Sequence, residues 1–420
     1  MTLMTSWVES ANSATTDFPL NNLPCGVFST NRLEARCGVA IGDMILDMAA
    51  LEEEGLITLA EAPVFDLPYW NEVMELGPEA WANLHARLIE LLSADAPDQA
   101  TVAPHLVPIA EARLHMPVAI SEYTDFYAGR HHATNVGTMF RGPENALPPN
   151  WLHMPIGYNG RASTVVVSGT EITRPNGQLK DADAEMPRFG PSERLDFELE
   201  MGAILGTSTE MGQPVHIDDA DEMIFGYVLL NDWSARDIQA WEYQPLGPFQ
   251  AKATATSISP WIVTKAALEP FRTNTPERDF ELLDHLKDVG PMLYDIDLSV
   301  TMAPEGKAPT EIARTNYDQM YYSAAQQLAH HSTSGCPMNV GDLLGSGTIS
   351  GPTKPERGSL LELSWGGKEP LTLDSGETRT FIEDGDTLTL QGAAKGDGYT
   401  IGFGDCTGTL LPALSDPFEG

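Results

Sequence analysis

Short apolar or alternating segments recur along the chain from residue 118 onward, and they constrain the fold more than any other feature. Clusters of Gly, Pro, Asn and Asp, which are typical of turns, separate them. The segments are residues 163–168, 195–204, 224–230, 296–302, 359–364 and 387–391. Helical patterns are fewer, and the clearest covers residues 317–330, where Met320, Ala324 and Leu328 recur at a spacing of one helical turn. The sequence therefore predicts an α+β fold that is mainly β.

Residues 1–117 show a different pattern and are predicted to form a small N-terminal domain. Gly42 and Asp43 lie between two short apolar segments, 39–41 and 44–46, which is typical of a β-hairpin. Residues 78–93 are predicted to be helical because large apolar side chains share one face: Trp81, Leu84, Leu88 and Leu92. Prolines then interrupt residues 94–117, so we place the boundary there and expect a second domain over residues 118–420.

The charge of the chain excludes several kinds of partner. It has 420 residues, of which 42% are hydrophobic, so it can bury a sizeable core. It carries 60 Asp and Glu against 24 Lys and Arg, a formal net charge of -36. Such a field repels phosphates, so we expect neither nucleic acid nor an anionic membrane surface as a partner. The acidity indicates either a solvated acidic surface or carboxylates that converge on a cation, and composition does not separate the two.

The N-terminal region and the cysteines predict a cytoplasmic protein. No basic residue precedes Arg32, and no apolar core of signal-peptide length follows the first Met. No apolar run approaches the length needed to span a bilayer. None of the four cysteines forms a C-x-x-C pair, so we expect reduced, buried thiols and no zinc site.

The acidic segment 195–201 admits two interpretations. In a strand, successive side chains point to opposite faces, so Asp196, Glu198 and Glu200 would share one face. A half-exposed strand with an acidic outer face would show this pattern, and the pattern alone favours it. In the alternative, Glu198 and Glu200 bind a hard cation, because neighbouring carboxylates repel unless a proton or a cation lies between them.

Residues 231–241 follow an apolar segment, which places Asp232 at the end of a predicted strand. If a helical turn starts here, Arg236 and Gln239 lie on one face. In the alternative, Asp232 caps the helix and Arg236 forms a surface pair with Asp237.

Asp125 lies among aromatic residues, where an unpaired carboxylate would be costly to bury. It either accepts backbone hydrogen bonds in a turn or has a functional role. His131 and His132 follow closely, whereas the histidines at 330–331 are expected at a helix C-terminus, which favours positive charge. The chain lacks a P-loop, a G-x-S-x-G elbow and an H-E-x-x-H motif, and the glycines of 345–351 do not have the dinucleotide-binding spacing.

Taken together, many short segments resemble the fumarylacetoacetate hydrolase family. They are residues 123–127, 132–137, 139–142, 150–153, 160–163, 167–170, 198–201, 231–239, 241–243, 246–249, 258–261, 347–351, 361–365 and 396–399. The resemblance covers residues 18 to 415. It implies a small SH3-like N-terminal β domain, a β-rich catalytic domain of the fumarylacetoacetase type and a homodimer. The implied reaction is hydrolysis of a carbon–carbon bond in 4-fumarylacetoacetate to fumarate and acetoacetate, the last step of tyrosine and phenylalanine breakdown.

The resemblance also implies roles for individual residues. The metal ligands would be Asp125, Glu198, Glu200 and Asp232, with Lys252 and Thr256 in the metal environment. Oxygen donors suit Mg²⁺ or Ca²⁺. His132 would be the general base, selected over His131 by the Ala-Thr-Asn that follows. Glu362 would orient His132, and a strand would place it on the face opposite Leu361 and Leu363.

The remaining implied residues stabilise charge or bind the diketo acid substrate. Developing negative charge would be stabilised by Arg236, Gln239 and Lys252. The substrate would be held by Tyr127, Arg141, Tyr158, Gln239, Tyr243 and Thr348. Asn159 stands where the family commonly has His, beside Tyr158. The alternatives are a related hydrolase of acylpyruvates, which the long N-terminal domain disfavours, and a non-catalytic acidic protein that only sequesters cations.

Overall fold

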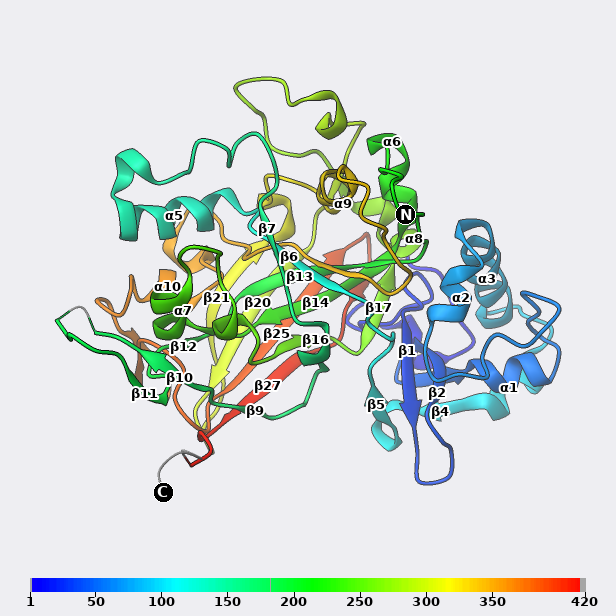
Figure 1. Ribbon diagram of the computed structural model, residues 1–420. Coiled ribbons are helices and arrows are strands. Elements are labelled where there is room, and N and C mark those ends of the chain that lie inside the picture. The colour runs from blue at the N-terminus through cyan, green and yellow to red at the C-terminus, as the bar shows by residue number, and fades with distance from the viewer. Residues whose placement is uncertain (1, 182, 416–420) are drawn as a thin grey trace.

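The computed structural model describes residues 2–181 and 183–415 and has a mixed, mainly β fold, as the sequence predicts (Figure 1). Residue 182 and the last five residues of the expected second domain lie outside the described part. Two large sheets carry most of the strands. In Figure 1 the N-terminal residues, coloured blue, lie to one side of the strands that follow.

The larger sheet has 13 strands and runs through both parts of the chain. Its main order is β4 (Leu106–Pro108), β3 (Met44–Asp47), β2 (Arg36–Ile41), β1 (Cys25–Ser29), β17 (Trp261–Thr264), β14 (Ile224–Asp232), β13 (Leu199–Leu205), β22 (Leu343–Gly345), β6 (Tyr123–Phe126) and β7 (Gly157–Asn159). Beside this path lie β5 (Arg113–His115), β8 (Val165–Val167) and β16 (Thr256–Ile258). Because β1 pairs with β17, the N-terminal strands extend the sheet that carries the acidic residues.

The second sheet packs apolar side chains against the first. It contains β21 (Thr310–Asn316), β20 (Asp297–Ala303), β25 (Thr387–Lys395), β27 (Cys406–Leu411), β9 (Ile172–Thr173) and β26 (Thr400–Gly402). Buried residues of both sheets, such as Met201 and Leu229 of the first and Leu298 and Leu390 of the second, belong to one hydrophobic cluster. Short two-stranded pairs complete the β structure: β10 (Asn176–Leu179) with β11 (Arg188–Pro191), β12 (Leu195–Asp196) with β15 (Ser234–Ala235), β18 (Arg272–Thr273) with β19 (Leu293–Tyr294), and β23 (Leu371–Thr372) with β24 (Thr378–Arg379).

Several predicted elements are confirmed. The hairpin forms between β2 and β3, where Ile41 faces Met44 and Gly42 has a φ of 59°, which a glycine adopts without strain. The predicted helix 78–93 is α3 (Pro78–Leu92), and Leu84 and Leu88 are buried beneath it. The other short helices are α1 (Met48–Glu53), α2 (Asn71–Glu75), α4 (Gln99–Val102), α6 (Ile217–Ala220) and α8 (Lys265–Leu268).

Three predictions need correction. The helix expected over 317–330 is α9 (Ala324–Ser332), which begins later because Ser323 and Gln326 form a capping box. Residues 359–364 do not form a strand: α10 (Leu360–Leu363) is a short helix capped by Ser359. Residues 94–117 are more regular than their prolines suggest, because β4 pairs with β3 and β5 pairs with β1.

Four further α-helices complete the α-helical structure of the described residues. They are α5 (Arg130–Arg141), α7 (Arg236–Glu242), α9 and α10; Figure 1 shows α5, α7 and α10 on the side away from the N-terminal residues. In the described part of the chain, no helix has the length and apolar character needed to cross a membrane. All four cysteines are free; Cys25, Cys37 and Cys406 are buried, as expected, whereas Cys336 is only half-buried.

Candidate active site

Neighbouring strands of the large sheet bring four carboxylates together. Asp125 lies on β6, Glu200 on β13 and Asp232 at the end of β14, while Glu198 lies between β12 and β13. One carboxylate oxygen from each lies within 4.8 Å of the others. The Glu198 amide donates to the side chain of Asn231 at 3.1 Å, which ties this segment to β14. The prediction that a strand ends at Asp232 is confirmed, and Asp232 is one of the four carboxylates of this acidic centre.

These carboxylates do not face solvent. Their exposed fractions are 0–4%, so the half-exposed acidic strand is excluded. The alternating segment 195–201 is not one strand: Asp196 Oδ1 accepts from the Phe197 amide at 2.9 Å, and the ladder resumes only at Leu199. Asp125 lies in a strand, so the interpretation as a turn residue is also wrong.

A glycine allows two of the carboxylates to approach. Gly345 of β22 lies opposite Asp125 on one side and Gly202 on the other. A Cβ at Gly345 would lie 2.7 Å from Asp125 Oδ1 and 3.1 Å from Glu200 Oε2. Any larger residue would therefore push these oxygens apart.

Replacing Gly345 with Ala should weaken divalent-cation binding by roughly 10- to 100-fold, the range typical of damage just outside the ligand set. Gly202→Ala is the matched control. It lies opposite Gly345 in the same ladder, but its Cβ would meet only apolar atoms, the nearest being Leu343 Cδ1 at 2.8 Å. Calorimetric titration with Mg²⁺ and Ca²⁺ measures both variants, and equal affinities would contradict the steric account.

Three oxygens of the centre lack a hydrogen-bond partner within the described residues: Asp125 Oδ1, Glu200 Oε1 and Asp232 Oδ1. The other oxygens are held in place. The Tyr158 hydroxyl donates to Asp232 Oδ2 at 2.8 Å, and the Gly347 amide donates to Glu200 Oε2 at 2.9 Å. Buried acceptors without donors are costly, and a divalent cation among them would satisfy all three.

Burial and mutual repulsion also disfavour the charged forms of two of these carboxylates. Burial and the neighbouring carboxylates raise the pKa of Glu200 well above its usual range, and burial with Asp125 and Glu198 outweighs Lys252 to raise the pKa of Asp232. Glu198 differs: although it is buried, Arg236 and Lys252 hold its pKa well below the usual range. Carboxylate oxygens are donors that hard cations prefer, so the cluster could hold a metal ion.

Lys252 and Thr256 both lie at this centre. Lys252 is buried and forms ion pairs with Glu198 and Asp232, which outweigh burial and raise its pKa. It is carried on a 3₁₀ turn, Gln250–Lys252, whose backbone amides donate to the carboxylate of Glu242. Thr256 is opposite Asp232 in the pairing of β16 with β14 and is fully buried.

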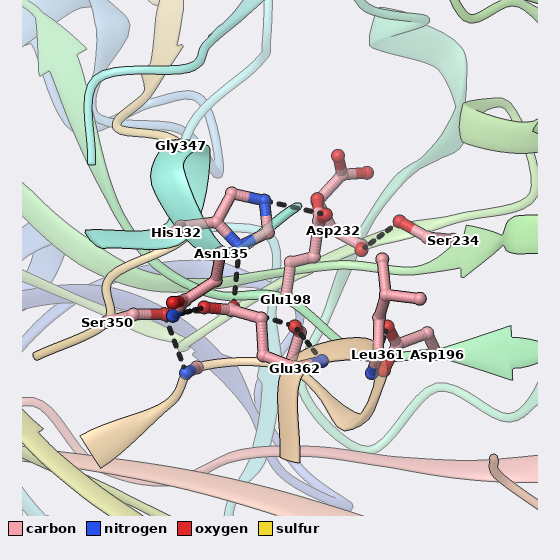
Figure 2. Close-up of polar contacts among 12 residues, drawn as sticks. His132, Asn135, Asp196, Glu198, Asp232, Ser234, Gly347, Ser350, Leu361 and Glu362 are labelled. Atoms are coloured by element: carbon pink, nitrogen blue, oxygen red, sulfur yellow. Dashed lines mark hydrogen bonds and ion pairs between the residues drawn. The ribbon is translucent and has the colours of Figure 1, made fainter. Parts of the chain in front are cut away.

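Beside the carboxylates lies a buried histidine–glutamate pair, which Figure 2 shows. His132 Nδ1 is 2.6 Å from Glu362 Oε2, and His132 Nε2 is 3.9 Å from Glu198 Oε1. Burial alone would raise the pKa of Glu362, but His132 and several hydrogen bonds lower it overall, so this carboxyl stays ionised near neutral pH. A carboxylate only accepts, so the Nδ1 proton points to Glu362 and Nε2 is left free to take a proton.

Glu362 is held by more groups than the sequence suggests. Asn135 Nδ2 donates to its Oε1 at 2.8 Å, and the hydroxyls of Ser350 and Ser359 donate to its Oε2 at 2.9 and 2.8 Å. These three partners were not predicted. Signals for two of them exist: Asn135 is one helical turn after His132, and Ser359 with Glu362 matches the S-x-x-E pattern of a helix start, which also argues against the predicted strand.

His131 lies elsewhere. It is half-buried and lines a cavity of about 670 Å³ with Arg130, Thr134 and Asn135, and none of the four carboxylates lines this cavity. Only His132 reaches Glu362, which agrees with the selection made from the residues that follow it.

Arg236 and Gln239 lie together on α7, as predicted, with Arg236 Nη1 donating to Gln239 Oε1 at 3.3 Å. Arg236 does not pair with Asp237. Its Nη2 contacts Asp196 at 2.8 Å and Glu198 at 2.7 Å, whereas Asp237 accepts from Ser192. Asp232 does not cap α7 either, because the residue before the helix is Ala235.

The expected substrate-binding residues divide into two sets. The Tyr127 ring meets the His132 ring edge-on, with 5.3 Å between their centroids, and Tyr158 donates to Asp232. Thr348 is buried, and its carbonyl oxygen lies close to Gly129, the residue before α5. Arg141 bonds to the carbonyls of residues 145 and 146, and Tyr243 is 50% exposed. Within the described residues, neither of these two contacts the carboxylates by a hydrogen bond or ion pair.

The fold and this centre indicate an enzyme in which a buried cluster of four carboxylates that could hold a metal ion lies beside a histidine. Two family models match the chain: "Fumarylacetoacetase N-terminal" over residues 21–117 and "Fumarylacetoacetate (FAA) hydrolase C-terminal" over residues 122–410. The chain belongs to the fumarylacetoacetate hydrolase family.

Similar proteins cover nearly the whole chain. The fumarylacetoacetase of Bos taurus is 50% identical over 95% of this chain and 97% of its own length, and that of Dictyostelium discoideum is 48% identical over 98% and 99%. The Homo sapiens fumarylacetoacetase is 49% identical over 95% of this chain and 97% of its own length. Among solved structures, Cg1458 with inhibitor shares the fold, with a TM-score of 0.53, 14% identity and coverage of 93% of this chain and all of that one.

Proposed function

We propose that this chain hydrolyses fumarylacetoacetate to fumarate and acetoacetate. Relatives named fumarylacetoacetase that share about half of its residues over nearly the full length support the substrate. The observation that carries the chemistry is the position of a buried histidine–glutamate pair next to four carboxylates, three of which each have an oxygen without a hydrogen-bond partner among the described residues. The reaction would be the last step of tyrosine and phenylalanine breakdown.

Asp125, Glu198, Glu200 and Asp232 would hold one Mg²⁺ or Ca²⁺, with Lys252 and Thr256 beside it. A divalent cation supplies Lewis acidity that polarises a carbonyl oxygen and orients a chelating diketone. Lys252 already neutralises part of the cluster through Glu198 and Asp232, so the three unpartnered oxygens are the groups that most require the cation.

His132 is the proposed general base. Its Nε2 takes a proton from water, and that water attacks the carbonyl carbon of the bond to be cleaved. Glu362 fixes the tautomer and stabilises the imidazolium that forms, and its lowered pKa keeps it ionised for this purpose. The carbon–carbon bond then breaks, the electron pair leaves as the enolate of acetoacetate, and the proton on His132 is available to that product.

Donors on α7 and the 3₁₀ turn would stabilise the negative charge that develops on oxygen. They are Arg236, Gln239 and Lys252. Arg236 and Lys252 are buried and Gln239 is half-buried, and preorganised donors are most effective where burial removes competing water. The substrate would be bound by Tyr127, Arg141, Tyr158, Gln239, Tyr243 and Thr348. Tyr243 directly follows α7, which also carries Arg236 and Gln239, so binding and charge stabilisation would share one helix.

The proposal includes the organisation of the protein: an SH3-like domain over residues 1–117, a catalytic domain over 118–420, a homodimer and a cytoplasmic location. The free cysteines are compatible with a reducing compartment.

The function is tested by following the loss of diketone absorbance when fumarylacetoacetate is added. We expect turnover that EDTA abolishes and Mg²⁺ or Ca²⁺ restores, because the centre requires the cation to hold the substrate. An acylpyruvate is the control substrate and should be turned over more slowly. No loss of absorbance with metal-loaded enzyme, or a preference for the acylpyruvate, would reject the proposed substrate.

A further inference from the structure

Asp196 is a buried carboxylate to which the proposed reaction assigns no role. It ends β12, two residues before Glu198, and its exposed fraction is 0%. It does not belong to the cluster of four carboxylates. Its two oxygens instead accept from N–H donors on three different segments of the chain, so it is bound more completely than the three cluster carboxylates whose oxygens lack partners.

The first of these contacts orients the side chain of Arg236. Asp196 Oδ2 accepts from Arg236 Nε at 2.8 Å and lies 2.8 Å from its Nη2. The same Nη2 contacts Glu198 Oε1 at 2.7 Å. A fork held on one edge by Asp196 has little freedom to rotate, so Asp196 determines where the guanidinium meets Glu198.

The second set of contacts holds the helix that carries Glu362. Asp196 Oδ1 accepts from the Leu360 amide at 2.7 Å, and Oδ2 accepts from the Leu361 amide at 3.0 Å. These are the first two amides of α10, which have no partner inside the helix. Figure 2 shows Asp196 beside Leu361, next to the Glu362 side chain that turns toward His132.

We infer that Asp196 is a positioning residue that couples the two halves of the active site. It holds Arg236 against Glu198, and it holds the start of α10 so that Glu362 meets His132. This inference rests on the proposed roles of His132 and Glu362. Without the Asp196 charge, Arg236 would turn fully to Glu198, and the first turn of α10 would lose the acceptor of its first two amides.

Asp196→Asn is the direct test, because it keeps the shape and removes the charge. One amide oxygen still accepts, but the amide nitrogen then opposes an N–H donor. We expect kcat per folded chain to fall by about 100-fold, as for a displacement of reacting groups on the ångström scale. KM should change less than threefold, and the stoichiometry of Mg²⁺ binding should stay the same.

Asp386→Asn is the matched control. Asp386 is another buried carboxylate in an ion pair, with Arg379 at 2.8 and 3.0 Å, and it also accepts from a backbone amide, that of Glu383. Both variants should lower Tm. Only Asp196→Asn should lower kcat, and equal kcat values in the two variants would show that Asp196 acts on stability alone.

A second pair of variants leaves Asp196 intact. Leu360→Pro removes the N–H that donates to Asp196 Oδ1, at the first helical position, where proline is tolerated, and after Ser359, whose extended backbone is compatible with a following proline. Leu360→Ala also shortens this buried side chain but keeps the N–H. We expect kcat of the Pro variant to be about tenfold below that of the Ala variant, and equal values would overturn the link to α10.

Glu362→Gln separates this inference from the proposed function. A large loss in Glu362→Gln with a wild-type kcat in Asp196→Asn would overturn the role of Asp196 and leave the function standing. A wild-type kcat in Glu362→Gln would instead remove the role of Glu362 on which the inference depends. If both are correct, Asp196→Asn lowers kcat much less in the Glu362→Gln background than in the wild type, whereas fully multiplicative losses would contradict the coupling.

Discussion

Replacing His132 with Ala is expected to lower kcat by about a thousandfold, within the range that a general base contributes. His132 is the imidazole whose Nδ1 is held by Glu362 and whose Nε2 faces the carboxylate cluster, 3.9 Å from Glu198. Removing it leaves the carboxylates and the donors on α7 in place. Cation binding and binding of a product analogue should therefore stay near wild type.

His131→Ala is the control for this variant. It removes the neighbouring imidazole on the same helix, which lines a cavity that none of the four carboxylates reaches. We expect activity within a few-fold of wild type. An unchanged kcat in His132→Ala, or an equal loss in both variants, would exclude His132 as the base.

Glu200→Gln is expected to have opposite effects on the metal-free and metal-loaded protein. Glu200 is buried, its Oε1 has no partner within the described residues, and burial with the neighbouring carboxylates raises its pKa. The amide keeps an acceptor for the Gly347 N–H but removes one ligand and one charge. Cation affinity and activity should fall by at least about 100-fold if the carboxylate binds the metal directly.

The stability of the same variant without metal is a second, independent test of the role of Glu200. In the metal-free protein, a raised pKa means that folding binds a proton at Glu200. Its stabilising contribution is present at acidic pH and is lost as pH rises through the raised pKa. Metal-free Glu200→Gln should therefore be at least as stable as the wild type near neutral pH, and its stability should depend less on pH between acidic and neutral conditions.

Thermal unfolding of both proteins with EDTA and with excess Ca²⁺ measures these effects. Excess ligand stabilises the form that binds it, so the wild type should gain Tm and the variant should not. A variant that is strongly destabilised without metal, or that gains as much Tm from Ca²⁺ as the wild type, would contradict the assignment of Glu200 as a ligand.

Local patterns predicted a good part of the fold. The hairpin at Gly42, the helix α3 and the strand that ends at Asp232 each depend on neighbouring residues, and all three are present. The shared face of Arg236 and Gln239 is also local, since it needs only the helical repeat.

The features that the sequence could not predict depend on contacts between segments that are far apart along the chain. The alternation in 195–201 is compatible with an outer face or a buried one. It is buried here, where side chains distant in sequence, such as Tyr158, Arg236 and Lys252, contact the carboxylate cluster. By sequence, Asp196 is one more acidic residue in that row, yet three of its four N–H donors lie 40, 164 and 165 residues away along the chain. The strand prediction for Glu362 was based on its apolar neighbours. It was wrong because Ser359 caps a short helix at this point instead.

The acidic residues behind the net charge of -36 fall into two groups in the structure. Only four acidic residues form the proposed metal centre, so the cluster does not account for the excess of Asp and Glu. The two interpretations of the composition therefore concern different residues. An acidic exterior would oppose an anionic substrate, which gives the cations at the site, Arg236 and Lys252, a further use in local attraction.

The central claim is that the four carboxylates bind one catalytic divalent cation beside His132. Titrating metal-free wild-type protein with Ca²⁺ or Mg²⁺, while measuring bound metal by calorimetry and fumarylacetoacetate hydrolysis in the same samples, tests it most directly. We predict one tight site per chain and activity that rises in proportion to its occupancy. Many weak sites, or full activity before any metal is bound, would contradict the account.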